Sequence, residues 1–109
     1  MKKILTLFTL LFSINALAAE PTIHDVYEVA VSGDMDKANL MMTEVISNHP
    51  DSAKAHYVFA QLLAKQDKFD LAKTEITKAE ELDPKLSDFQ EESVKELKDF
   101  INKNIAIKP

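Results

Sequence analysis

Residues 53–84, AKAHYVFAQLLAKQDKFDLAKTEITKAEELDP, decide the fold. Apolar residues in this stretch recur at three- and four-residue steps, through Leu63 in its first half and Ile76 in its second, which is typical of amphipathic helices. A polar break at 66–68 separates the halves, and Pro84 closes the second because the residue before a proline disfavours helical backbone. The stretch therefore predicts two helices joined by a short turn.

Capping signals indicate where these helices begin and end. Ser52 is a candidate N-cap, because its hydroxyl can accept a hydrogen bond from a backbone N–H of the first turn. We expect the first helix to run from there to about Lys65. The second helix should begin at Phe69 and end near Leu82, just before the closing proline.

The composition favours helices along the whole chain. Its 109 residues allow one small domain, and one glycine and four prolines leave few residues for the turns of a strand-rich fold. Alanine, leucine, lysine and glutamate, all good helix formers, are abundant. There is no cysteine, which excludes disulfides, thiol catalysis and zinc–thiolate sites. The predicted fold class is all-α.

The chain repeats itself with a period of 34 residues. Aligning residues 26–50 with residues 60–84 gives five identities in 25 positions: Ala30/Ala64, Asp36/Asp70, Ala38/Ala72, Thr43/Thr77 and Pro50/Pro84. Apolar residues also fall on apolar residues across the two segments. The first unit should therefore hold a helix from about Thr22 to Val31, a turn at 32–34 and a second helix that opens with Met35.

The second unit resembles a tetratricopeptide repeat. The residues that carry the resemblance are His56-x2-Phe59-Ala60-x2-Leu63, then Ala72-x3-Ile76, then Ala79 and Pro84. The first unit is similar but more degenerate, reading Thr22-x2-Asp25-Val26-x2-Val29, Ala38-x3-Met42, Val45 and Pro50. Asp25 departs from the family pattern, which has a large apolar residue there. The resemblance implies two helix-turn-helix hairpins within 19–86, at about 19–52 and 53–86.

A fifth helix is predicted for residues 87–103. Ser87 followed by Gln90 is a capping-box signature, and Phe89, Val94, Leu97 and Ile101 follow at helical steps. Charged residues cover the rest, as expected of a helix that caps a repeat array. Residues 104–109 show no clear periodicity and are expected to form a tail. The full expectation is a short α-solenoid of two hairpins and a C-terminal capping helix.

Residues 1–18 read as a signal peptide. Lys2 and Lys3 precede the apolar run 4–12, and Ala16-Leu17-Ala18 gives the small-x-small pattern of a cleavage site. The alternative is an uncleaved membrane anchor, although the run is short for a bilayer span. We expect a small exported bacterial protein that is periplasmic or secreted, with no membrane span in the mature chain.

The charge of the chain disfavours nucleic acid as a partner. The formal net charge is −5, and loss of Lys2 and Lys3 with the signal peptide would make it −7. All the cationic side chains other than histidine are lysines, so arginine, the residue best suited to bidentate capture of phosphate, is missing. Such a surface repels a phosphate backbone.

No catalytic, metal or cofactor site is predicted. His24, His49 and His56 are 25 and 7 residues apart, which matches no common metal-ligand spacing. Adjacent carboxylates such as Glu80 and Glu81 diverge on a helix surface and stay solvated instead of converging in a cleft. A single glycine cannot build a phosphate-binding loop, and no serine lies in a nucleophile elbow. The protein is therefore not expected to be an enzyme.

The family resemblance implies a concave groove lined by the first helix of each hairpin, which holds a peptide or a partner helix. By position this implicates Ile23, Tyr27 and Val31 in the first unit and Lys54, Tyr57, Gln61 and Lys65 in the second. The lysines could pair with an acidic side chain or a C-terminal carboxylate; the alternative is that the two tyrosines and two lysines are ordinary surface residues. We expect a non-catalytic protein–protein interaction module of the bacterial cell envelope. The alternative is a structural homo-oligomer, since two repeats are few for a continuous core.

Overall fold

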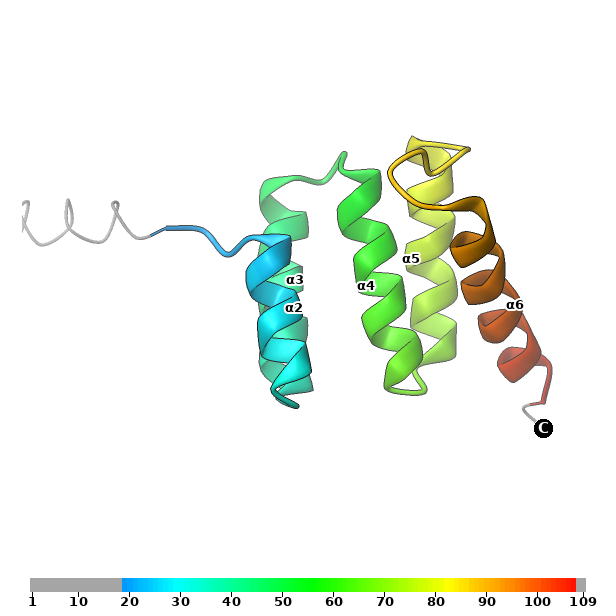
Figure 1. Ribbon diagram of the computed structural model, residues 1–109, viewed down its shortest axis with the longest axis horizontal. Coiled ribbons are helices and arrows are strands. Elements are labelled where there is room, and N and C mark those ends of the chain that lie inside the picture. The colour runs from blue at the N-terminus through cyan, green and yellow to red at the C-terminus, as the bar shows by residue number, and fades with distance from the viewer. Residues whose placement is uncertain (1–18, 108–109) are drawn as a thin grey trace, which may run out of the picture.

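The computed structural model describes residues 19–107, and the predicted signal peptide at 1–18 lies outside them. Within the described chain there are five helices and no strands: α2 (Ile23–Val31), α3 (Met35–Asn48), α4 (Ala53–Lys65), α5 (Phe69–Leu82) and α6 (Glu91–Ile107). The predicted all-α class is confirmed. Consecutive helices run antiparallel and pack in chain order, with α4 in the middle (Figure 1). No helix within residues 19–107 is long and apolar enough to cross a membrane.

Capping side chains determine where α2 and α4 begin. Ser52 accepts a hydrogen bond from the Ala55 N–H and starts α4, as its sequence position predicts. Thr22 starts α2 with a complete capping box, in which its hydroxyl accepts from the Asp25 N–H and the Asp25 carboxylate accepts from the Thr22 N–H. These hydrogen bonds, first the one from the Thr22 backbone, lower the pKa of Asp25.

Each hairpin turns through one residue with a positive φ. Gly33 has a φ of 99° between α2 and α3, and Asp67 has a φ of 61° between α4 and α5. The two residues are one repeat period apart, so the same turn position is left-handed in both hairpins. The left-handed region suits glycine, whereas an aspartate is tolerated there at some cost.

Two apolar clusters form the core, and α4 contributes to both. The first cluster lies between α2, α3 and α4 and contains Val26, Ala38, Met42, Val45, Ala55, Val58 and Leu62. The second lies between α4, α5 and α6 and contains Tyr57, Ala60, Leu63, Ala64, Ala72, Ile76, Ala79, Leu86 and Ile101. The small residues Ala60, Ala72 and Ala79 are fully buried, which lets the helices approach closely.

His56 fastens the second hairpin from inside the core. Its side chain is buried, with Nδ1 2.7 Å from Glu75 Oε1 on α5 and Nε2 3.0 Å from the backbone oxygen of Pro50. Each ring nitrogen therefore faces an oxygen atom, and the tautomer of the ring decides which of the two contacts it donates to. The ring therefore ties α5 to the connection between α3 and α4.

The fifth helix differs from its predicted bounds of 87–103 at both ends. It begins at Glu91, because Ser87 does not cap it: the Ser87 N–H and hydroxyl both donate to Asp83 Oδ2, at 2.9 and 2.7 Å. These bonds, first the one from the hydroxyl, lower the pKa of Asp83. The turns that result bury Leu86 in the second cluster. At the other end α6 continues to Ile107, through part of the predicted tail.

Polar contacts hold α6 against α5 and leave its far side charged. Lys98 Nζ lies 2.8 Å from Glu80 Oε2, and Lys73 Nζ donates to the Asn102 side-chain oxygen at 2.8 Å. The outer face of α6, which points away from the other helices, carries exposed charged side chains: Glu92, Lys95, Glu96, Asp99 and Lys103. Within the described residues α6 therefore packs on α5 through one face and presents charged side chains on the other.

Candidate binding groove

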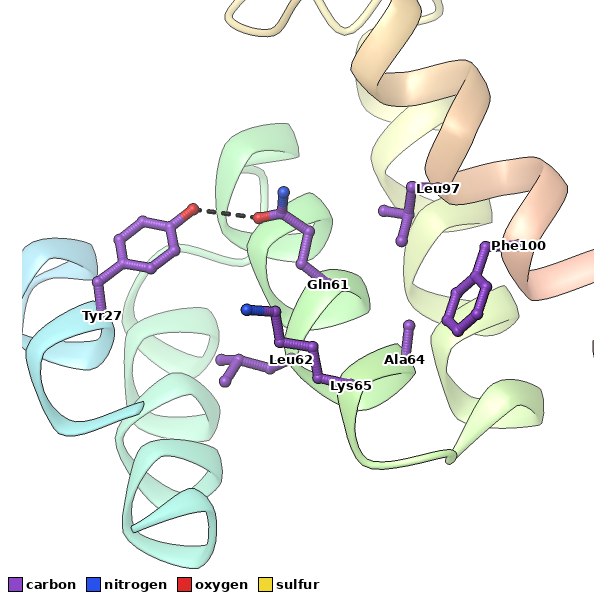
Figure 2. A pocket seen from close by; sticks show the side chains of 7 residues that line it. All are labelled: Tyr27, Gln61, Leu62, Ala64, Lys65, Leu97 and Phe100. Carbon is purple, nitrogen blue, oxygen red and sulfur yellow. Dashed lines mark hydrogen bonds between the residues drawn. The ribbon is translucent and has the colours of Figure 1, made fainter. Parts of the chain in front are cut away.

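A hollow of about 340 Å³ opens between α2, α4 and α6. It combines one aromatic side chain from α2, several side chains from α4 and two from α6, which Figure 2 shows from close by. The residues that line it are Tyr27, Gln61, Leu62, Ala64, Lys65, Leu97 and Phe100. We call this hollow the groove.

The side of the groove between α2 and α4 is polar. The Tyr27 hydroxyl donates a hydrogen bond to Gln61 Oε1 at 3.1 Å, so the two helices are joined across the opening. In Figure 2 the Lys65 side chain extends from the end of α4 and turns its ammonium toward the Tyr27 side. Lys65 is exposed, and no hydrogen bond or ion pair to another residue within 19–107 occupies its ammonium. This side therefore offers hydrogen-bond donors and one positive charge.

The side of the groove between α4 and α6 is apolar. Leu97 and Phe100 reach from α6 toward Ala64 on α4 (Figure 2). The Phe100 ring is held edge-on against Phe69 with the ring centroids 5.4 Å apart, yet the residue remains 47% exposed. A large aromatic side chain that is oriented by its neighbour and still exposed is well suited to contact a ligand.

Three of the seven groove residues inferred from the sequence line the groove: Tyr27, Gln61 and Lys65. Burial raises the pKa of the Tyr27 hydroxyl, in keeping with its position at the edge of the hollow. Tyr27 and Gln61 are repeat-equivalent, one period of 34 residues apart, so the repeat places them opposite each other. The sequence positions therefore identify the three residues on the polar side of the groove.

Tyr57 does not lie on the groove surface, contrary to the sequence-based expectation. It is fully buried, because Phe89 from the connection between α5 and α6 packs on its ring, with the centroids 4.0 Å apart. Its hydroxyl has no hydrogen-bond partner among the described residues. Burial, and next the nearby Tyr27, raises the pKa of Tyr57. Phe89 thus covers the position at which Tyr57 would have extended the stripe of exposed groove residues.

The remaining three inferred residues lie elsewhere. Ile23 is half-buried at the start of α2, where it lines a separate shallow hollow with His49 and Ser52. Val31, at the end of α2, is 87% exposed, and Lys54 is exposed in the first turn of α4. Neither Val31 nor Lys54 is among the residues that line the groove.

The sequence reasoning missed four residues of the groove. Leu62 and Ala64 belong mainly to the core and only border the hollow. Leu97 was expected to face the array, and Phe100 was not singled out. The available signal was that Phe100 is three residues after Leu97, next to the apolar stripe of α6 and not on it.

Each of the three histidines lies close to one glutamate. The pairs are His24 with Glu28 at 3.1 Å, His49 with Glu20 at 3.8 Å and His56 with Glu75 at 2.7 Å. In the part of the chain that the structure describes, no three histidine, aspartate or glutamate side chains gather in a way that could hold a metal ion. What the groove offers chemically is a cation, hydrogen-bond donors and apolar surface.

Comparison with known proteins adds no further guide to the groove. No protein-family model, curated protein or solved structure matches this chain.

Proposed function

We propose that this protein is a non-catalytic interaction module of the bacterial cell envelope that binds a peptide or a partner helix in the groove. The observation that carries the proposal is the hollow between α2, α4 and α6, where the exposed rings of Tyr27 and Phe100 face a shared opening. Tyrosine and phenylalanine are enriched in the cores of protein interfaces. The volume of the groove, about 340 Å³, lies within the range of about 300–1,000 Å³ that is usual for ligand sites.

The repeat pattern supports a tetratricopeptide-type module. Two hairpins that are one period of 34 residues apart, followed by a further helix, give a stack of adjacent helices. In this stack α2, α4 and α6 all border one hollow. Arrays of this kind use their concave faces for binding. The envelope location rests on the signal-peptide pattern of residues 1–18.

Site-specific photo-crosslinking in cells tests the proposal. Benzoylphenylalanine would be introduced at Tyr27 or Phe100 in the groove and, as a matched control, at Leu71. Leu71 is also an exposed apolar residue, but it lies on α5 outside the groove. We expect adducts with a second protein from the two groove positions and none from Leu71.

The other outcomes are equally informative. Adducts of twice the chain mass from the groove positions would favour the structural homo-oligomer. Equal adducts from all three positions, or none from Tyr27 and Phe100, would count against the groove as a binding site.

A further inference from the structure

The two sides of the groove differ in chemistry, and this difference restricts what can bind. The polar side presents the Tyr27 hydroxyl, the Gln61 amide and the Lys65 ammonium. The apolar side presents Leu97 and Phe100. In Figure 2 Tyr27 lies on one side of α4 and Leu97 and Phe100 lie on the other, with Gln61 and Lys65 extending from α4 between them. A ligand that fills the hollow therefore meets donors and a cation on one flank and hydrocarbon on the other.

The charge of α4 sets it apart from its neighbours. Its sequence, AKAHYVFAQLLAK, contains two lysines and no aspartate or glutamate, whereas each of the other described helices contains at least two acidic residues. Glu28, an acid one position after Tyr27, lies 3.1 Å from His24. Among the seven residues that line the groove, Lys65 is the one charged residue, so the groove carries a positive charge on a chain whose formal net charge is −5.

From these observations we infer that the groove selects a partner segment in which a carboxylate lies next to an apolar side chain. The carboxylate would contact the Lys65 ammonium and the Gln61 amide N–H groups beside it, and the apolar side chain would rest against Leu97 and Phe100. The carboxylate can belong to an aspartate, a glutamate or the C-terminus of the segment, since all three present the same oxygens. This inference rests on the proposed function and names the chemistry of its partner.

The net charge of the protein favours basic segments instead of acidic ones, so the two expectations can be tested against each other. A chain of formal charge −5 should attract basic segments at long range. At physiological ionic strength, however, the screening length is about 8 Å, so contacts inside the groove outweigh charges elsewhere on the surface. Selection at that ionic strength therefore reports on the groove.

Peptide display on the immobilised full chain provides the test. We expect selected peptides to be enriched in an acidic residue, or a free C-terminal carboxylate, beside an aromatic or aliphatic residue. In a selected peptide, replacing the carboxylate by its amide should weaken binding about two- to fivefold, the range for a charged contact that is largely exposed. In the Lys65→Met variant the acid and amide peptides should bind equally.

A matched control separates local from global charge. Lys65→Glu and Lys37→Glu change the net charge equally, but the exposed Lys37 lies on α3 outside the groove. Lys65→Glu should abolish the preference for acidic peptides and Lys37→Glu should retain it, provided that circular dichroism shows equal helicity.

Three results would overturn the inference: enrichment of basic or uncharged peptides, no enrichment at all, or equal effects of the two charge reversals. A crosslinked partner from Tyr27 and Phe100 combined with any of these would leave the proposed function standing and remove only the carboxylate preference. Absence of a partner in both experiments would remove both.

Discussion

The two hairpins follow one sequence pattern, but their first helices bury very different numbers of residues. The first helix of the first hairpin, α2, has nine residues, of which only Val26 is buried. The first helix of the second, α4, has thirteen residues, of which eight are buried. The difference comes from position, because α4 packs between both clusters whereas α2 packs at the edge of one. In a short array, the number of neighbours decides how much each repeat contributes to stability.

The hairpins also differ at one equivalent position. Thr22 and His56 are one repeat period apart, yet Thr22 caps α2 while His56 lies inside α4 and bonds to Glu75 and Pro50. As a result α2 begins about one turn later in the repeat than α4. The second hairpin gains a buried polar anchor that the first does not have.

The largest expected effect tests whether α4 couples the two clusters. Ile76→Ala should lower the free energy of unfolding by about 2 to 5 kcal/mol, because it leaves a cavity at a fully packed position. Met42→Ala, at the equivalent position of the first hairpin, should fall in the same range. Urea denaturation would give both values.

Amide hydrogen exchange separates these two variants. Met42→Ala should lower protection mainly in α2 and α3, which lie at the edge, whereas Ile76→Ala should lower it in every helix. A uniform loss of protection in both variants would show that the hairpins unfold as one unit. The difference in burial between α2 and α4 would then not correspond to a difference in local stability.

The polar anchor gives the next largest effect. His56→Ala should cost about 2 to 3 kcal/mol, because it removes two hydrogen bonds and leaves the Glu75 carboxylate, only 12% exposed, without its closest partner. Thr22→Ala at the equivalent position should cost about 1 kcal/mol, the usual value of an N-cap. A double-mutant cycle of His56→Ala with Glu75→Gln, followed by denaturation, would measure the coupling. A coupling energy near zero would mean that the His56 ring acts only by packing.

Tyr57→Phe should change stability in the opposite direction. A buried hydroxyl without a partner is unfavourable, so its removal should raise the free energy of unfolding by about 1 kcal/mol. The pKa of Tyr57 is raised in the folded state, so the folded protein holds this proton longer than the unfolded chain does, and stability falls as pH rises above about 10. Thermal melting at neutral and alkaline pH should show a smaller alkaline loss in the variant. A lower melting temperature at neutral pH would indicate that the hydroxyl has a partner in solution.

The smallest effect concerns the turns. Asp67→Gly should stabilise the protein by less than about 1 kcal/mol, because glycine adopts a φ of 61° without steric cost. Gly33→Ala should destabilise it by about 1 kcal/mol through the backbone alone, since an added Cβ would meet no atom within 4 Å. Differential scanning calorimetry of both variants measures the two changes. Shifts of the same sign would show that the two turns are not equivalent.

Local chemistry explains how far the sequence predicted the fold. The ends of α4 and α5 follow from Ser52, the polar break and Pro84, all of which act on residues close by in the chain. The start of α6 was misplaced because Asp83 competes for Ser87, and sequence spacing alone does not rank that bond against a capping box.

The groove was only partly predictable for a related reason. Tyr27 and Gln61 follow from the repeat period, which sets neighbouring helices in register. Tyr57 was placed wrongly because its burial depends on Phe89, whose position is determined by the path of the chain from 83 to 90. That path combines the local hydrogen bonds between Asp83 and Ser87 with the packing of Leu86 into the second cluster, and this second, tertiary contact is not encoded by sequence spacing.

The charged outer face of α6 has a consequence for how such an array could grow by gene duplication. A new hairpin inserted between α5 and α6 would meet apolar surface on both sides, because these two helices already meet through the second cluster. A hairpin added after α6 would have to bury exposed charges such as Lys95 and Asp99, which is unfavourable without partners. Longer descendants of this chain are therefore expected to gain units between α5 and α6 and not directly after α6.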